Sequence, residues 1–120
     1  MVKRIVIAGC RNYNNYEEAK RFIEYCLGDI TEENAIIIVS GGAQGADAIG
    51  ERFAIEKGYI IERYAADWKT YGRKAGPIRN KQMAEICDLL ICFWDGKSKG
   101  TKSIIYYAKK YGKPTKIKMI

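Results

Sequence analysis

The sequence of 120 residues predicts an α/β fold: one compact Rossmann-like domain with a mostly parallel five-stranded sheet and helices on both faces. The pattern of apolar residues along the chain supports this prediction. Short β-branched runs alternate along the chain with longer segments whose apolar residues recur at helical spacing. Strands and helices that alternate in this way form right-handed crossovers onto a parallel sheet. Because a chain of this length builds one core, we expect residues 1–120 to form a single domain.

Five short apolar segments are the predicted strands. The β-branched runs Lys3–Ala8 and Ala35–Val39 each end at glycine or serine-glycine, as buried strands do. Tyr59–Tyr64 is the third strand. Asp88–Trp94 is the most continuously apolar segment, which is typical of an interior strand buried on both faces. Thr115–Met119 is expected to be a short edge strand.

Four helices are predicted between the strands. Tyr16–Leu27 has apolar residues at i, i+3, i+4, i+7 and i+8, and Asn15 with Glu18 resembles a capping box at its start. The other three are placed by their spacing and their stop signals: Ala46–Ala54 with an end at Gly58, Pro77 to about Cys87, and about Thr101–Tyr111 with an end at Gly112.

The composition excludes several classes of protein. With 48% apolar and 29% charged residues, the chain is not expected to be disordered. No apolar run approaches the roughly 18 residues of a membrane helix, and the first residues do not resemble a signal peptide. We therefore expect a cytoplasmic protein with no membrane partner. The absence of histidine excludes histidine triads, histidine general bases and histidine metal ligands.

The four cysteines, Cys10, Cys26, Cys87 and Cys92, contain no CxxC pair. This spacing predicts neither a zinc site nor a disulfide framework, and we interpret the cysteines as small apolar residues in a reducing compartment. No metal-site motif is present, and the sequence leaves the identity of any cofactor unknown.

The positive charge is concentrated at one end of the chain. Residues 96–120 hold eight lysines and no acidic residue, whereas residues 1–95 are nearly neutral. Such a block attracts nucleic acid or phosphorylated ligands, but on charge alone it is more typical of a solvated, lysine-rich helix face and tail.

The chemically interesting residues follow the predicted strands. In an open parallel sheet, ligands bind outside the carboxyl ends of the strands, where the strand order reverses. Two segments there precede helices: the glycine-rich Ser40–Asp47 and the Gly- and hydroxyl-rich Asp95–Thr101. Backbone N–H groups at a helix start suit a phosphate. Neither segment is a GxGxxG dinucleotide motif or a GxxxxGK[ST] P-loop.

These positions give a set of candidate ligand-binding residues. The backbone and hydroxyl groups expected to hold phosphate belong to Gly9, Ser40, Gly41, Gly42, Gly45, Gly96, Ser98, Gly100 and Thr101. Arg11 and Arg79 would add charge, with Asn80 beside them. Asp47 or Asp67 would bind sugar hydroxyls, although Asp47 equally fits a helix start on electrostatic grounds alone. Asp95 is a candidate as the first residue of the segment Asp95–Thr101. Trp68 would stack on a base.

Four motifs together resemble a known family. They are Ser40–Asp47, Asp67-Trp68-x-x-Tyr71-Gly72, Ala75-Gly76-Pro77-x-Arg79-Asn80-x-x-Met83 and Trp94-Asp95-Gly96-x-Ser98-x-Gly100-Thr101. In this order they resemble the YspA-like branch of the SLOG superfamily. The resemblance implies a Rossmann-like domain that binds a nucleotide or a nucleotide-derived ligand, and it is compatible with a homodimer. Relatives of this branch include the LOG phosphoribohydrolases, molybdenum-cofactor carrier proteins and the single-strand-binding DprA proteins.

The sequence departs from the LOG enzymes at one position. Those enzymes carry a PGGxGTxxE motif with a catalytic Glu, together with an Arg that Arg79 matches. Here Gly100 and Thr101 remain, and Ile104 stands where the Glu would be. An isoleucine neither moves a proton nor stabilises a cationic centre. If the chain is an enzyme, Arg79 is the catalytic candidate that the resemblance implies, and Asp67, Asp95 or Asp47 would have to supply the missing carboxylate.

Three hypotheses follow from the sequence. The leading one is a sensor or carrier that binds a small phosphorylated nucleotide-like ligand in the crevice. The second is an N-glycosidic hydrolase or transferase that acts on nucleoside monophosphates. The third is a nucleic-acid-binding module that uses the lysine-rich residues 96–120.

Overall fold

Five parallel strands form one open sheet in the computed structural model, which describes all residues 1–120. The strands are β1 (Val2–Gly9), β2 (Ala35–Ser40), β3 (Ile60–Arg63), β4 (Leu89–Trp94) and β5 (Thr115–Met119). Their order across the sheet is β3-β2-β1-β4-β5, and every neighbouring pair is parallel. The predicted Rossmann-like α/β fold is confirmed.

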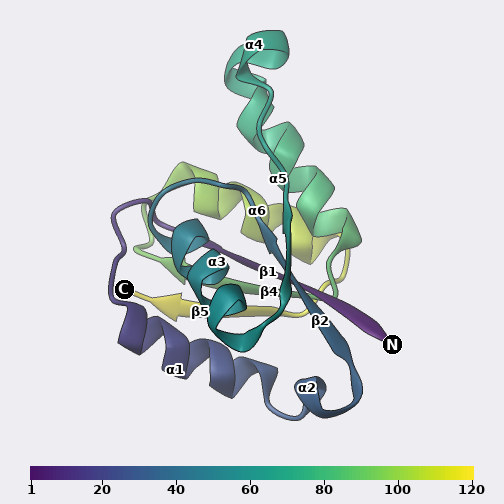
Figure 1. The fold of residues 1–120 in the computed structure, drawn as a ribbon. Coiled ribbons are helices and arrows are strands. Elements are labelled where there is room, and N and C mark those ends of the chain that lie inside the picture. The colour runs from purple at the N-terminus through teal and green to yellow at the C-terminus, as the bar shows by residue number, and fades with distance from the viewer.

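Helices cover both faces of the sheet (Figure 1). On one face lie α1 (Tyr16–Leu27) and α3 (Ala46–Lys57), and on the other lie α5 (Ala75–Ile86) and α6 (Lys99–Lys110). Three short elements complete the chain: α2 (Ile30–Glu33), α4 (Trp68–Tyr71) and the 3₁₀ turn η1 (Gly72–Lys74).

Alternation along β1 builds the two halves of the core. Ile5 and Ile7 pack with α1 and α3, whereas Val6 and Ala8 pack with α5 and α6. This follows from the two-residue repeat of a strand. Leu89 through Phe93 of β4 are all buried, so the prediction of an interior strand buried on both faces is confirmed.

Two stretches that we expected to be turns contain short helices. The segment after α1 forms α2, and the segment before Pro77 forms α4 and η1. Asp67 caps α4 by accepting a hydrogen bond from the amide of Thr70 at 3.1 Å. Helix α5 starts at Ala75 rather than at Pro77, so the proline lies in the first turn, where its missing N–H leaves no bond unmade.

The α4–η1 segment projects from the rest of the molecule. Figure 1 shows α4 beyond the sheet, at the far end of α5. Residues 67–74 are all exposed, and they include Trp68 and Tyr71, which are 53% and 50% exposed. This projection contributes to the elongated extents of 40 × 29 × 25 Å.

The chain topology places a crevice between β1 and β4. From β1 the chain continues through β2 to β3 on one side, and it then crosses to β4 and β5 on the other side. The strand order therefore reverses between β1 and β4, and the loops after these two strands diverge to opposite faces. In open α/β sheets this is where ligands bind.

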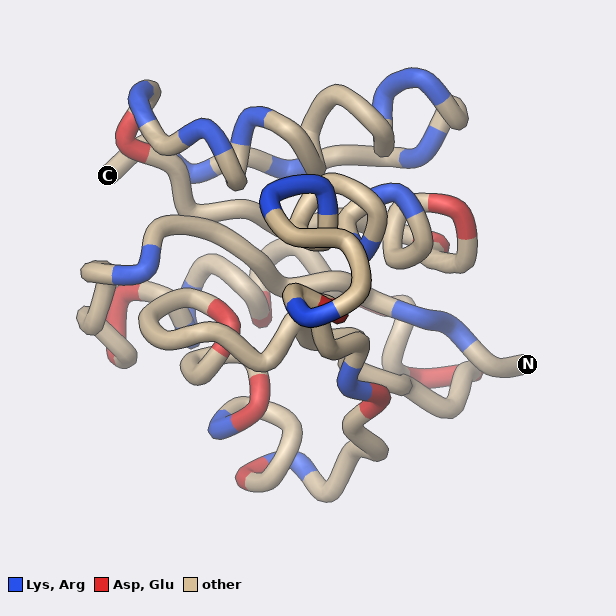
Figure 2. Tube along the Cα trace, turned by 90° about the horizontal axis from the view of Figure 1, so that it is seen from above, with Lys and Arg blue, Asp and Glu red and all other residues tan.

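Charge is divided between the two helical layers. In Figure 2 the side that carries the C-terminus is mostly blue, and most of the red lies on the opposite side. The α6 lysines Lys99, Lys102, Lys109 and Lys110 are exposed, as expected of a solvated helix face. All four cysteines are free thiols. None of the helices has the length and apolar character needed to cross a membrane.

Candidate functional site

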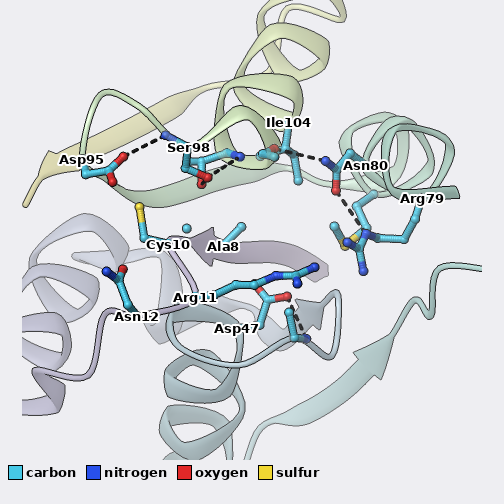
Figure 3. Close-up of a pocket in the computed structure, with 15 residues that line it drawn as sticks. Ala8, Cys10, Arg11, Asn12, Asp47, Arg79, Asn80, Asp95, Ser98 and Ile104 are labelled. Atoms are coloured by element: carbon cyan, nitrogen blue, oxygen red, sulfur yellow. Dashed lines mark hydrogen bonds between the residues drawn. The ribbon is translucent and has the colours of Figure 1, made fainter. Parts of the chain in front are cut away.

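A cavity of about 370 Å³ lies at the reversal point, at the carboxyl ends of β1 and β4 (Figure 3). We call it the main cavity. It is lined by residues that follow β1, residues around the start of α3, residues of α5, and residues around the start of α6. The lining residues are Ala8, Gly9, Cys10, Arg11, Asn12, Ala43, Asp47, Arg79, Asn80, Met83, Asp95, Ser98, Gly100, Thr101 and Ile104.

Some backbone amides of the glycine turn before α3 already have hydrogen-bond acceptors within the protein. The Gly42 amide donates to the Ser40 hydroxyl at 3.0 Å, and the Ala43 amide donates to Asp47 Oδ2 at 3.1 Å. The Gly42 amide, one of the groups expected to hold phosphate, therefore has a hydrogen-bond acceptor within the protein. The amides of Asp47 and Ala48, in the first turn of α3, have no partner in the protein.

The turn before α6 is organised in the same way. Asp95 Oδ1 accepts from the amides of Lys97 and Ser98 at 2.8 and 2.9 Å, and Ser98 caps the helix by accepting from the Thr101 amide at 3.4 Å. These backbone hydrogen bonds lower the pKa of Asp95, so its carboxylate is ionised at neutral pH. The amides of Lys99 and Gly100 have no protein partner.

Arg79 enters the crevice from α5. Its Nη1 donates to the carbonyl oxygens of Gly41 at 2.7 Å and Tyr64 at 3.4 Å, and its Nε donates to Asn80 Oδ1 at 3.1 Å. Asn80 in turn donates to the Gly100 carbonyl at 3.2 Å. This chain of bonds links the glycine turn, α5 and the start of α6. The Nη2 group of Arg79 has no partner and is available to a ligand.

The Arg11 side chain extends toward Arg79 inside the crevice. Figure 3 shows the Arg11 side chain extending from the loop after β1 toward the side of the cavity where Arg79 lies. Burial lowers the pKa of Arg79, and repulsion by Arg11 lowers it further, although an arginine stays charged at any pH of interest. Neither guanidinium belongs to any of the four ion pairs of the structure.

Asp47 is the buried carboxylate of the site. Its side chain faces the main cavity, and the residue is only 7% exposed. Burial raises the pKa of Asp47, against the opposing effects of the Ala43 amide, Arg79 and Arg11. Burial thus opposes the ionisation of Asp47, while the two arginines favour it.

The remaining wall of the main cavity is apolar or neutral. Ile104, 2% exposed, and Met83, likewise 2% exposed, form an apolar part of the wall. Burial raises the pKa of the Cys10 thiol, which therefore stays protonated near neutral pH and is a poor nucleophile. Across the described chain, no group of three or more His, Cys, Asp or Glu side chains lies close enough to hold a metal ion.

A second hollow of about 420 Å³ adjoins the main cavity. Three residues line both hollows, namely Arg11, Ala43 and Arg79, and we call them the ridge. On its far side the second hollow is bounded by Gly41, Gly42, Gln44, Arg63, Ala65, Ala66 and Trp68. The half-exposed Trp68 thus lines the same hollow as Arg11 and Arg79.

The structure brings most of the sequence-predicted residues together. Those that line the main cavity are Gly9, Arg11, Asp47, Arg79, Asn80, Asp95, Ser98, Gly100 and Thr101. Gly41, Gly42 and Trp68 line the second hollow instead. Four predicted residues line neither: Ser40, Gly45, Asp67 and Gly96.

Each of these four has a structural role. Ser40 is fully buried and supports the glycine turn, and Asp67 caps α4. Gly45 has φ +73°, and a Cβ there would lie 2.4 Å from the carbonyl oxygens of Cys10 and Arg11. Gly96 has φ +80° and turns the chain after β4. Both glycines are therefore required by the backbone path.

Sequence reasoning missed several lining residues. Arg63 was overlooked because it is the last residue of a short edge strand, yet its place at a carboxyl strand end was the available signal. Asn12 directly follows Arg11 and carried the same positional signal. Met83 offered one signal, because it ends a motif that carries the family resemblance. Ala8, Ala65 and Ala66 offered none, since small residues in such positions are ordinary packing.

Comparison with known proteins gives one family and one fold. Residues 3–71 match the model of a family described as YspA, cpYpsA-related SLOG family. The "Gene 61 protein" of Mycobacterium phage D29 is 31% identical over 121 residues, which cover 94% of each chain.

Among solved structures, the chain is similar to DNA processing protein A from Streptococcus pneumoniae, with a TM-score of 0.72 and 18% identity. It is also similar to DNA processing protein A from Helicobacter pylori, with a TM-score of 0.69 and 22% identity. The matches cover 98% and 96% of this chain but 50% and 64% of those proteins, so the chain spans less than two thirds of either. At these identities the likeness shows a shared fold.

Proposed function

The chain belongs to the YspA, cpYpsA-related SLOG family, and from that premise we propose that it binds a nucleotide or nucleotide-derived phosphorylated ligand in the crevice, as a sensor or carrier. The single observation that carries this proposal is the convergence of Arg11 and Arg79 on one ridge, with neither guanidinium in an ion pair. Arginine recognises phosphate through paired N–H donors, and an unpaired, half-buried guanidinium gains most from an anionic partner.

The surroundings of the ridge suit the rest of a nucleotide. The main cavity, about 370 Å³, falls within the usual range for small-molecule sites. Asp47, Asp95 and Asn80 offer hydrogen-bonding groups for hydroxyls, and the apolar wall at Met83 and Ile104 suits a flat ring. Trp68 offers a further stacking surface beside the second hollow.

The geometry supports binding better than hydrolysis of an N-glycosidic bond. Ile104, which takes the place of the LOG glutamate, lies in the wall of the main cavity and contributes no proton-transfer group. Of the alternative carboxylates, Asp67 caps α4 and lines neither hollow. Asp95 accepts hydrogen bonds from two backbone amides, and Asp47 accepts one from the Ala43 amide. Incubation with nucleoside monophosphates followed by chromatography for released base tests the enzymatic alternative, for which release of free base would be the positive result.

Thermal denaturation with a panel of nucleosides and nucleoside mono-, di- and triphosphates tests the binding proposal. A ligand at a hundred times its Kd stabilises the folded state by about 2.7 kcal/mol, which for this chain length raises the Tm by about 10 °C. We expect such a rise with at least one phosphorylated compound, and its loss in Arg79→Ala. Lys109→Ala is the matched control, because this exposed lysine lies in the last turn of α6, away from the crevice. A panel without any stabilising phosphorylated compound would refute the proposal.

A second candidate function is binding of single-stranded nucleic acid, and the α4–η1 projection favours it. Trp68 and Tyr71 are half exposed there beside Lys69, Arg73 and Lys74, which are also exposed. Aromatic side chains among cations are the usual platform for unpaired bases. DNA processing protein A from Helicobacter pylori, which shares this fold, binds single-stranded DNA.

Fluorescence anisotropy with a labelled oligodeoxynucleotide tests this second function and locates its surface. Binding through the projection is weakened by the pair Trp68→Ala and Tyr71→Ala, whereas binding through the lysine-rich segment is weakened by charge reversal at Lys109, Lys110 and Lys113. Either surface predicts affinity that falls steeply with salt. Absence of binding at low salt would remove this candidate. The expected homodimer is a separate proposal, which sedimentation velocity tests.

A further inference from the structure

The second hollow has a different electrostatic character from the main cavity. Three guanidinium groups, those of Arg11, Arg63 and Arg79, line it, and no Asp or Glu is among its lining residues. The main cavity shares Arg11 and Arg79 but also exposes the carboxylates of Asp47 and Asp95. We refer to the second hollow, with these three arginines, as the arginine hollow.

The backbone of the arginine hollow is shaped for close approach. Gly41 and Gly42 form part of its wall, so no side chain of theirs separates a ligand from the main chain. A Cβ at Gly41 would lie 2.7 Å from Arg79 Nη1, and a Cβ at Gly42 would lie 3.0 Å from Arg63 Cδ. The glycines are thus what allows both arginines to lie against this turn.

Arg63 is held in place by a residue behind it. Its Nε donates to Glu51 Oε2 at 3.0 Å and its Nη2 donates to Glu51 Oε1, while the Ser40 hydroxyl donates to the same carboxylate at 2.7 Å. Glu51 therefore orients Arg63 and offsets one of the three positive charges. The excess of positive charge left in the hollow belongs to Arg11 and Arg79.

The turn before α6 is the competing place for a phosphate, and its charge argues against that role. Asp95 already occupies the amides of Lys97 and Ser98, and its ionised carboxylate stands beside the helix start. A phosphate at the same turn would meet this negative charge. Hydroxyl groups, in contrast, are good donors to a carboxylate.

We propose that the arginine hollow is the phosphate subsite of the crevice, and that the main cavity receives the hydroxyl-bearing sugar of the same ligand. This inference rests on the proposed function, and it adds Arg63 as a specificity-determining residue and Glu51 as its positioning residue. It also orients the ligand, with its phosphate in the hollow that Trp68 lines and its sugar toward Asp47 and Asp95. In this orientation the base packs on the apolar wall at Met83 and Ile104 rather than on Trp68.

Isothermal titration calorimetry with inorganic pyrophosphate and with adenosine monophosphate, at low salt, tests this orientation. Arg63→Ala removes a charged donor, and we expect both affinities to fall about tenfold or more. Glu51→Gln keeps one acceptor oxygen that holds Arg63 and Ser40 in place but removes the negative charge that opposes the anion. We therefore expect both affinities to rise about threefold or more. Circular dichroism melts of each variant establish that it is folded.

Two further variants complete the design. Lys109→Ala is the control for loss of one positive charge, because about 15 Å of helix separates it from the start of α6, and its affinities stay within about twofold of wild type. Lys99→Ala reports on the competing subsite at the start of α6. If Lys99→Ala lowers the affinity for both probes and Arg63→Ala leaves it unchanged, the inference is overturned.

The outcomes separate this inference from the proposed function. If adenosine monophosphate binds and both Arg63→Ala and Glu51→Gln leave its affinity unchanged, the ligand orientation is wrong and nucleotide binding stands. If pyrophosphate binds with the expected response to both variants but no nucleotide binds, the anion subsite stands and the proposed function fails. Absence of binding by both probes contradicts both.

Discussion

Substitution of alanine for Gly41 and for Gly45, two glycines of one turn, is predicted to have opposite consequences. Gly45 has φ +73°, and a Cβ there would lie 2.4 Å from two backbone carbonyl oxygens and 2.5 Å from the carbonyl carbon of Arg11. A left-handed conformation alone costs a non-glycine residue about 1–2 kcal/mol. Overlap with main-chain atoms that have no room to move brings the expected loss for Gly45→Ala to about 3 kcal/mol or more.

Gly41→Ala meets a different kind of obstacle. Its φ is not positive, and the nearest atoms to the new Cβ are side-chain ends: Arg79 Nη1 at 2.7 Å, Asp47 Oδ2 at 2.8 Å and Arg79 Cζ at 3.0 Å. These ends swing aside, which breaks the 2.7 Å hydrogen bond from Arg79 to the Gly41 carbonyl. The gain of about 0.4–1 kcal/mol from a stiffer unfolded chain offsets most of that loss, so stability changes little. The guanidinium, however, leaves the ridge where the ligand is expected.

Thermal melts and calorimetry with adenosine monophosphate distinguish the two variants. For a domain of this size, 1 kcal/mol corresponds to about 4 °C, so Gly45→Ala should melt about 12 °C or more below wild type. Gly41→Ala should melt within about 4 °C of wild type and bind about tenfold or more weakly. If Gly41→Ala binds as wild type does, Arg79 is not a ligand-binding group. If Gly45→Ala melts as wild type does, the steric account of this turn is wrong.

Three further predictions concern buried groups of the site. Burial raises the folded-state pKa of Asp47 above its ordinary 3.8, so the folded protein binds the Asp47 proton more tightly than the unfolded chain does. The resulting stabilisation of the folded state is complete below the unfolded pKa and is lost as the pH rises through the folded pKa. Urea denaturation should therefore find Asp47→Asn more stable than wild type at pH 7 and equal to it near about pH 3, whereas a gain that does not depend on pH would contradict this assignment. Ile104→Glu places a carboxylate at a position that is 2% exposed. Urea denaturation should show that the free energy of unfolding falls by about 3 kcal/mol. An unchanged midpoint would mean that water reaches this part of the cavity wall. Cys10, 3% exposed and with its pKa raised by burial, should react with iodoacetamide at pH 7.5 much more slowly than the same thiol in urea, and equal rates by mass spectrometry would count against its burial.

Much of the fold could be predicted because its signals are local. The helix Tyr16–Leu27 was placed to the residue by its apolar spacing and by Asn15, whose side chain does accept the Glu18 amide. The β-branched strands were found in the same way. The α2 and α4 helices were missed because four residues are too few for a periodic signal, and their formation depends on a cap or a neighbouring turn.

The candidate site could be located from sequence but not described in detail. Topology places the ends of β1 and β4 together, so Arg11 and Asp95 were correctly assigned to one crevice edge. Which amides are free depends on hydrogen bonds to side chains within each turn, such as the one from the Gly42 amide to the Ser40 hydroxyl. No rule of residue spacing predicts those bonds. The same holds for Arg63, whose importance arises from the acid that holds it and from the ridge it faces.

Residue-resolved NMR titration with adenosine monophosphate is the most direct test of where the ligand binds. Amide shifts should change in the turns before α3 and α6, at residues 41–48 and 95–101, and around Arg79, while α1 and α2 stay unchanged. Shifts confined to the α4–η1 projection or to the carboxyl-terminal half of α6, with the two turns unaffected at saturation, would contradict binding in the crevice.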